Sequence, residues 1–301
     1  MFKFNKIPHL LVLLGILPLV LSCEEVIDLE LNNPDQQRIV VEGRITTVYG
    51  PQQLRLTQTL SYFEHEPAPI LQDIEAKIVE EGTGREFPLT LADDSTGYYR
   101  TEDMAGKVGE TYRLIIEKGE DTYEAVTFLD TVPDIDSISF EYSLQQFFGV
   151  RFGQYSVKIS TFEPAPEGDL YTAIIYLNDT LYTEEVGQNL YFDDFGINNT
   201  YVSEIELFSF AQEEIYLDTN TVRIEMYSMS EEEFNFLIGL FNESYGNGSI
   251  FSGPPANIPT NIINISGGID GCGFFGASDK TVIEGTFLKE HDESTNNPFF
   301  E

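Results

Sequence analysis

The chain has 301 residues, and its 51 acidic side chains against 16 basic ones give a formal net charge of −35. This charge argues against nucleic acid as a partner, because binding phosphates requires clustered lysine and arginine. Hydrophobic residues make up 42% of the chain, with 23 Phe and 16 Tyr, which excludes a disordered protein. The length predicts about two domains.

Residues 1–22 have the features of a secretory signal. Lys3 and Lys6 precede an apolar run that is too short to span a membrane. The following Val20-Leu21-Ser22-Cys23 resembles a bacterial lipobox, in which cleavage leaves the cysteine as an acylated N-terminus. Two or more acyl chains hold a protein stably on a bilayer, whereas one chain does so only marginally. We therefore predict that Cys23 is the lipidation site; an ordinary signal with an incidental cysteine is the alternative.

The residues after this cysteine favour the cell surface. Glu24 and Glu25 are similar to the acidic export signal of Bacteroidota surface lipoproteins, and they disfavour an anionic inner leaflet. We predict an outer-membrane lipoprotein that is exposed at the surface, with residues 23–37 forming the lipidated cysteine and a polar tether.

Residues 38–130 are predicted to form a β-sandwich. Short segments that are rich in β-branched and aromatic residues, or that alternate apolar and polar residues, follow one another between turns. They are residues 38–47, 53–59, 76–80, 97–100, 111–117 and 121–128. About seven strands in about 100 residues are typical of an immunoglobulin-like or transthyretin-like sandwich.

Residues 131–301 are predicted to form a second β-rich domain, since residues 129–137 have the proline and acidic residues of a domain boundary. Its predicted strands are residues 137–142, 155–161, 170–177, 180–185, 207–210, 221–228 and 280–287. One short helix interrupts them. Ser230 and Glu233 fit a capping box, and apolar residues follow at helical spacing.

Several motifs along the mature chain are similar to those of one bacterial family. They are residues 22–29 (SCEEVIDL), 40–43 (VVEG), 132–137 (VPDIDS), 251–257 (FSGPPAN) and 276–278 (GAS). In this order they resemble the Bacteroidota outer-membrane lipoproteins catalogued as domain of unknown function 4249, over essentially the whole mature chain. The resemblance implies an accessory lipoprotein of a nutrient-uptake complex, encoded beside a TonB-dependent outer-membrane transporter. It brings no catalytic residues with it.

The sequence offers little for catalysis. Nucleophilic catalysis pairs Ser or Cys with a base, usually His, and only His65 and His291 remain after signal removal. A Cys272–His291 pair is less plausible than a small buried thiol in a turn. The glycine-rich residues 267–278 lack the Lys-Ser/Thr and the following helix of a phosphate site, so they predict tight turns and close strand approach. We predict that the protein is not an enzyme.

Asp193 and Asp194 lie beside aromatic residues, where they suggest a calcium site or a glycosidase acid pair. Adjacent residues of a strand point to opposite faces, however, and no D-x-D-x-D-G loop is present. Solvated acidic surface explains most of the acidic side chains. We therefore predict no cofactor and keep calcium as the weaker alternative.

Aromatic residues in two irregular segments are the remaining candidates for binding. The first group is Tyr191, Phe192 and Phe195, and the second group is Phe147, Phe148 and Phe152. Exposed aromatic side chains on loops bind ligands or enter a partner's pocket, although Phe and Tyr are also common in sandwich cores. The absence of Trp argues against stacking on sugars in particular.

These observations predict a lipid-anchored accessory or ligand-binding subunit of a TonB-dependent uptake complex. Its partners would be the outer membrane and the transporter barrel, and its ligand a small molecule, glycan or peptide. The alternatives are a surface hydrolase acting on glycan or peptide, and a structural adhesin.

Overall fold

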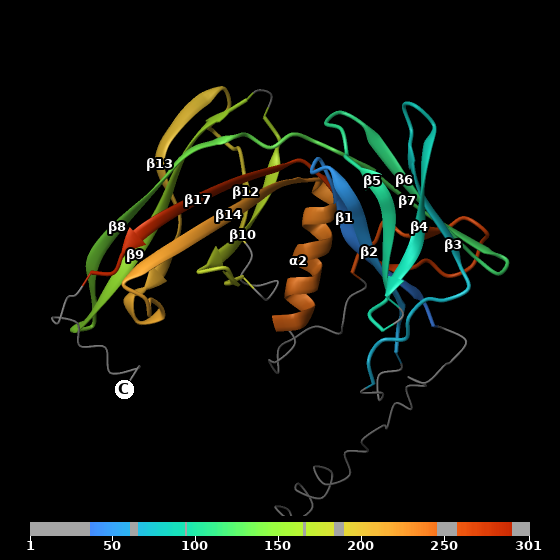
Figure 1. Cartoon of the computed structure of the whole chain (residues 1–301), viewed down its shortest axis with the longest axis horizontal. Helices are drawn as coiled ribbons and strands as arrows, with labels where there is room; N and C mark the ends of the chain where they lie inside the picture. Colours follow the sequence, from blue (N-terminus) through green and yellow to red (C-terminus); the bar gives the residue numbers. More distant parts are fainter. Residues whose placement is uncertain are drawn as a thin grey trace, which may run out of the picture.

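The computed structural model describes residues 37–60, 66–93, 95–164, 167–183, 190–245 and 258–290. In these residues the structure is mostly β, with one α-helix, α2, over Glu231–Tyr245. Figure 1 shows two β bodies with α2 between them. The prediction of a β-rich protein with one short helix is confirmed.

The nine-stranded body is one mixed sheet with the order β15-β7-β6-β3-β4-β5-β2-β1-β16. In chain order its strands are β1 (Ile39–Thr46), β2 (Gly50–Gln58), β3 (Glu75–Glu80), β4 (Arg85–Asp93), β5 (Tyr98–Met104), β6 (Thr111–Lys118), β7 (Asp121–Phe128), β15 (Ile263–Asn264) and β16 (Cys272–Ser278). Only β1 and β16 pair in parallel; the other neighbours are antiparallel.

This sheet curls around one core because β4 changes its partner along its length. Residues 85–89 pair with β3, and residues 90–93 pair with β5, with an irregularity in that register between Leu91 and Asp93. Alternate residues then point inward from both layers. The core includes the fully buried side chains of Leu54, Ile78 and Phe275, and burying each such side chain contributes about 1.5–3 kcal/mol.

The two-sheet body holds the remaining strands. Its five-stranded sheet consists of β10 (Leu170–Leu177), β11 (Thr180–Leu181), β12 (Leu190–Asp193), β14 (Thr219–Met229) and β17 (Lys280–Leu288), with β11 and β12 both paired to β10. Its three-stranded sheet consists of β8 (Ile135–Phe147), β9 (Val150–Glu163) and β13 (Thr200–Ala211). Side chains from both sheets meet in a second core, which includes Val157, Ile175, Phe210 and Ile224.

The C-terminal strands connect the two bodies, since they belong to both. After α2 the chain returns to the nine-stranded body, where β15 pairs with β7 and β16 pairs with β1. It then crosses back and adds β17 to β14 in the two-sheet body. Figure 1 shows this red segment running between the bodies. The expected boundary at residues 129–137 coincides with one crossing, and the division into domains 38–130 and 131–301 stays a prediction about folding units.

Three sequence expectations differ from the structure. The immunoglobulin-like sandwich is not confirmed, because its strands belong to one curled sheet that includes a parallel pair. Strand β16 lies in the glycine-rich residues 267–278, where we expected tight turns and close strand approach; the close approach is present at Gly273, but the segment is a strand. Residues 143–155, which lacked a clear strand pattern, form most of the β8–β9 hairpin.

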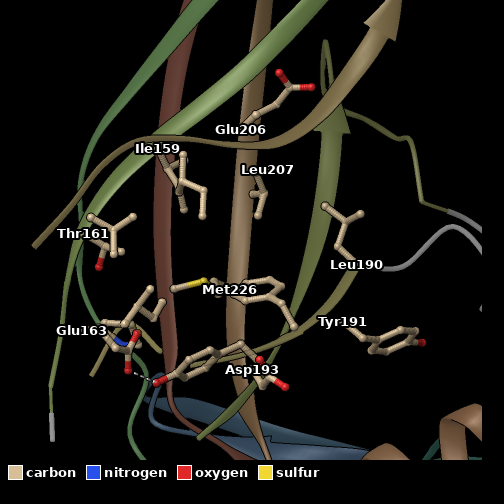
Figure 2. Close-up of a pocket in the computed structure, with 15 residues that line it drawn as sticks. Ile159, Thr161, Glu163, Leu190, Tyr191, Asp193, Glu206, Leu207 and Met226 are labelled. Carbon is tan, nitrogen blue, oxygen red and sulfur yellow. Dashed lines mark hydrogen bonds between the residues drawn. The ribbon is translucent and has the colours of Figure 1, made fainter. Parts of the chain in front are cut away.

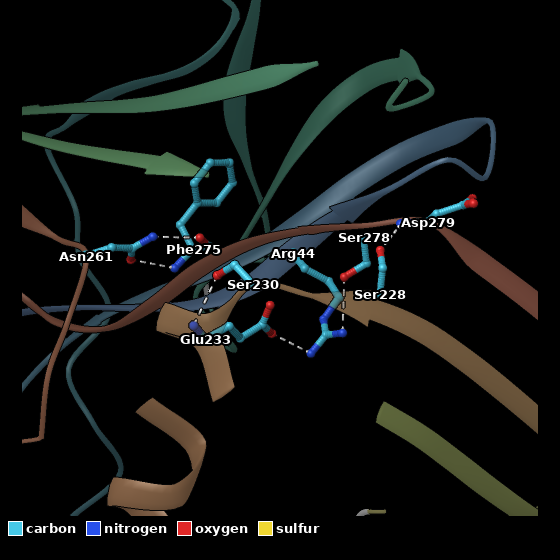
Figure 3. A network of polar contacts seen from close by, with 8 residues as sticks. All are labelled: Arg44, Ser228, Ser230, Glu233, Asn261, Phe275, Ser278 and Asp279. Atoms are coloured by element: carbon cyan, nitrogen blue, oxygen red, sulfur yellow. Dashed lines mark hydrogen bonds and ion pairs between the residues drawn. The ribbon is translucent and has the colours of Figure 1, made fainter. Parts of the chain in front are cut away.

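A polar network lies where α2, β1 and β16 meet (Figure 3). Arg44 on β1 donates to the Glu233 carboxylate at 2.7 Å and to Ser278 Oγ at 3.3 Å. The backbone N–H of Glu233 donates to Ser230 Oγ at 3.1 Å, which confirms Ser230 as the N-cap. Burial raises the pKa of Glu233, and the Arg44 guanidinium lowers it in part. This ion pair links α2 to the nine-stranded body.

Candidate functional site

A pocket of about 220 Å³ lies between the two sheets of the two-sheet body. We call it the inter-sheet pocket. Its walls are mainly apolar and come from both sheets, as Figure 2 shows. The lining residues that carry the argument are Ile159, Glu163, Tyr171, Glu206, Leu207 and Met226. Ligand pockets commonly measure about 300–1,000 Å³, so this one suits a small ligand.

The pocket has a distorted strand along one wall. The register between β13 and β9 shifts between Val202 and Ile205, both of which line the pocket. Between them Glu204 has a φ of 52°, and its N–H donates to Ser160 Oγ. A non-glycine residue in this conformation is strained, and bulges are frequent beside binding sites. The bulge is therefore a second feature that marks this wall.

A buried carboxyl group stands at one end of the pocket. Glu163 is only 2% exposed, and one of its oxygens accepts a hydrogen bond from the Tyr171 hydroxyl at 2.6 Å. Burial raises the pKa of Glu163, the Tyr171 hydrogen bond lowers it in part, and the nearby charges of Asp169 and Asp194 raise it further. The pKa of Tyr171 is also raised, chiefly by burial.

Glu163 belongs to a group of three carboxyl groups, in which one oxygen each of Glu163, Asp169 and Asp194 lie within 4.8 Å of one another. Both oxygens of the buried Asp194 accept from the Gly168 N–H, at 3.0 and 3.1 Å. Burial raises the pKa of Asp169, and the charges of Asp130 and Asp194 add to this effect. The group therefore holds three carboxyl groups close together, two of them buried and one half-buried.

Carboxylate oxygens of this kind suit a hard cation such as calcium, which takes about six to eight oxygen ligands. The three carboxyl groups would supply part of that shell. The buried Oδ1 of Asn198, whose Nδ2 donates to the Asp194 carbonyl, makes no hydrogen bond within the described part of the chain. Calcium binding, the weaker alternative from the sequence, stays a prediction.

The family model described as Domain of unknown function (DUF4249) matches residues 24–284. The chain belongs to this family. The family inferred from the sequence motifs is thereby confirmed, while the bacterial lineage and the lipoprotein nature that the resemblance implied stay predictions. No match to the chain is found among the curated proteins.

The structure places the first group of predicted binding residues around the inter-sheet pocket. Tyr191 and Phe192 lie on β12 and line it, and the Phe192 ring lies 5.7 Å from that of Tyr171. Phe195 is 80% exposed and lies outside, in an adjoining hollow at the start of α2. Asp193 is exposed, whereas Asp194 is buried.

The second group lies elsewhere. Phe147 ends β8 and Phe152 lies on β9, so neither is in a loop. Phe148 occupies the turn between these strands, with a φ of 47° and 93% of its surface exposed. The pocket uses the opposite end of β9, from Ile159 to Glu163. The structure therefore does not bring the two groups together.

Sequence reasoning missed the acidic end of the pocket. Glu163 ends β9 and Asp169 directly precedes β10, and neither residue was among the candidates that the sequence offered. Tyr171 lies within a strand that was predicted correctly. The sequence signal that could have indicated this site is the run of acidic residues before Tyr171, namely Glu163, Glu167 and Asp169. Nothing in the linear pattern places Asp194 beside them.

The structure adds no support for a catalytic role of the cysteine and histidine residues that the sequence offered. Cys272 is half-buried, and burial raises the pKa of its thiol, which makes the reactive thiolate scarcer. His65 and His291 lie outside the described residues, as do the signal at residues 1–22 and the expected lipidation site Cys23. Within the described ranges, no helix has the length and apolar character needed to cross a membrane.

The raised pKa of Glu163 predicts a measurable pH dependence. The folded protein binds this proton more tightly than the unfolded chain, whose glutamates titrate near 4.5, so the contribution of Glu163 to stability falls as the pH rises above that value. In the Glu163→Gln variant, residue 163 does not titrate, so this pH-dependent loss of stability is absent. We expect the variant's free energy of unfolding to increase relative to wild type as the pH rises above about 4.5.

Urea unfolding at several pH values, in the presence of a chelator, measures this difference. Glu206→Gln is the matched control, since Glu206 lines the same pocket with an exposed side chain. The control should follow the wild-type pH profile. A constant difference between Glu163→Gln and wild type at all pH values would contradict the prediction.

Proposed function

We propose that this protein is a lipid-anchored, non-enzymatic binding module that serves as an accessory subunit of a TonB-dependent uptake complex in an outer membrane. In this proposal the nine-stranded body is the scaffold and the two-sheet body binds a small ligand. The transporter barrel is the protein partner.

The inter-sheet pocket carries the ligand-binding part of the proposal. It combines apolar walls with a polar end at Glu163 and Tyr171, and a few polar groups in an apolar cavity are the usual composition of a ligand site. Two of the predicted aromatic residues, Tyr191 and Phe192, line it. The strained bulge in β13 at Glu204 lies on the same pocket.

The N-terminal residues support the anchoring part. The basic residues, the apolar run and the cysteine at position 23 follow one another as in lipoprotein signals, and the family match begins directly after that cysteine. A strongly acidic protein is repelled by anionic lipid headgroups, so covalent acyl chains are the physical means by which it would stay on such a membrane.

Replacing Cys23 by alanine is expected to move the protein from the membrane fraction to the soluble fraction, because the acyl chains can no longer be attached. Cys272→Ala is the matched control, since it removes the other cysteine and leaves the lipobox intact. Fractionation of cells that produce each full chain measures the distribution. Retention of Cys23→Ala in the membrane would contradict lipid anchoring.

The same cells test the partner. A C-terminal tag on the wild-type chain is expected to recover a large β-barrel protein from solubilised membranes in near-stoichiometric amount, as judged by mass spectrometry. Recovery of the chain alone at native expression would contradict the accessory role. Turnover of a glycan or peptide by the purified protein would favour the hydrolase alternative instead.

A further inference from the structure

We infer that the inter-sheet pocket binds a small apolar molecule that carries one ammonium group, with the ammonium against Glu163. This inference rests on the proposed function, in which the two-sheet body is the ligand-binding part. It adds the chemical class of the ligand.

The apolar walls exclude a strongly polar ligand. Ile159, Leu207 and Met226 face the space between the sheets in Figure 2, together with Leu190 from β12. A sugar in this position would place hydroxyl groups against side chains that form no hydrogen bonds, and each such loss costs about 1–3 kcal/mol. An aliphatic or aromatic body fits these walls.

The charges of the pocket exclude an anionic ligand. The charged residues that line it are Glu163, Asp193 and Glu206, and no lysine, arginine or histidine is among the described residues of the lining. A carboxylate or phosphate would bring like charge into a poorly solvated space, where repulsion is strong. The ligand is therefore neutral or cationic.

The surroundings of Glu163 favour a cationic ligand over a neutral one. Its carboxyl group is buried beside Asp169 and Asp194, and among the described residues none of the three forms an ion pair. The groups that face Glu163 are the Tyr171 hydroxyl and these two carboxylates. A buried acidic group of this kind gains most from a cation, because a charge-assisted hydrogen bond is about twice as strong as a neutral one.

An organic ammonium fits this end better than a metal ion. Three carboxyl groups meet here among the described residues, whereas calcium takes about six to eight oxygen ligands. Glu163 also lines the apolar cavity, so a cation placed there can extend an apolar chain along Ile159 and Leu207.

Titration calorimetry of the full mature chain tests the inference with three probes of one length: hexylammonium, 1-hexanol and hexanoate. At pH 7.5 with a chelator, we expect hexylammonium to bind at least about tenfold more tightly than 1-hexanol, the ratio that a hydrogen bond to a charged group supplies. Hexanoate should bind least tightly of the three.

Two variants locate the ammonium. Glu163→Gln should reduce the affinity for hexylammonium to that for 1-hexanol and leave 1-hexanol unchanged. Glu284→Gln, an exposed position on β17 of the same body and outside the pocket lining, should leave both affinities unchanged. If Glu163→Gln does not fold, the wild-type protein still decides: the affinity for hexylammonium, but not for 1-hexanol, should rise with pH as Glu163 loses its proton.

Equal binding of hexylammonium and 1-hexanol would overturn the ammonium inference and leave the binding function standing. Failure of all three probes to bind would overturn the pocket's role in the proposed function as well. If calcium alone binds, and Glu163→Gln abolishes its binding while hexylammonium shows no preference, the acidic end is a metal site and the inference is wrong.

Discussion

Replacing Arg44 by methionine is expected to lower the free energy of unfolding by about 3–5 kcal/mol. Arg44 donates to Glu233 at 2.7 Å, and the Glu233 side chain is only 7% exposed. Methionine keeps most of the apolar length of arginine but leaves Glu233 buried without its cation. Gly276 lies against the same carboxylate, since an added Cβ there would be 2.9 Å from Glu233 Oε2.

Urea unfolding followed by circular dichroism measures this loss. Arg55→Met is the matched control, since Arg55 lies on the adjacent β2 and pairs with Glu42 at an exposed site. It should cost less than about 1 kcal/mol. The double variant Arg44→Met/Glu233→Met should recover most of the stability, because it removes both buried charges. A loss of similar size in Arg44→Met and Arg55→Met would contradict the role of this pair.

Replacing Gly273 by alanine is expected to lower the free energy of unfolding by at least about 3 kcal/mol. Gly273 has a φ of 83°, and an added Cβ would lie 2.0 Å from the backbone oxygen of Val41 on β1. Because that atom belongs to the paired backbone, the contact is relieved only by separating β16 from β1.

Gly267→Ala is the control for backbone strain alone. Gly267 has a φ of 91°, and an added Cβ would meet nothing within 4 Å. We expect a cost of about 1–2 kcal/mol there, from the left-handed conformation. The difference between the two variants, measured by urea unfolding, reports the close approach of β16 to β1. Equal losses would show that strain alone accounts for Gly273.

Local patterns predicted much of this fold. Alternation at Leu54 and Leu56 indicated β2, and both side chains are buried in the core. Ser230 and Glu233 predicted the start of α2 correctly. These features depend on neighbouring residues, so a linear pattern contains them.

The partners of the strands were not predictable in this way. Strand β16 has glycines in place of β-branched residues, because β1 approaches it closely; the glycines predicted this close approach, but neither the strand itself nor its partner. Glu233 was assigned to a capping box, but its carboxylate pairs with Arg44. Contacts between residues so far apart in the sequence leave no local periodicity.

For the same reason, the sequence indicated only part of the candidate site. Tyr191 and Phe192 were chosen for their chemistry, and they do line the inter-sheet pocket. Glu163 and Asp194 are brought together by two strands and a loop, and only the folded chain shows that they share one buried position.

The parallel pairing of β1 with β16 has a consequence for biosynthesis. Val40, the second residue of β1, lies opposite Cys272, so β1 lacks one neighbour until residues 272–278 have left the ribosome. Pairings so distant in sequence form slowly, and unpaired strand edges promote aggregation in the meantime. Nascent chains that stall before residue 272 should therefore remain protease-sensitive and dependent on chaperones.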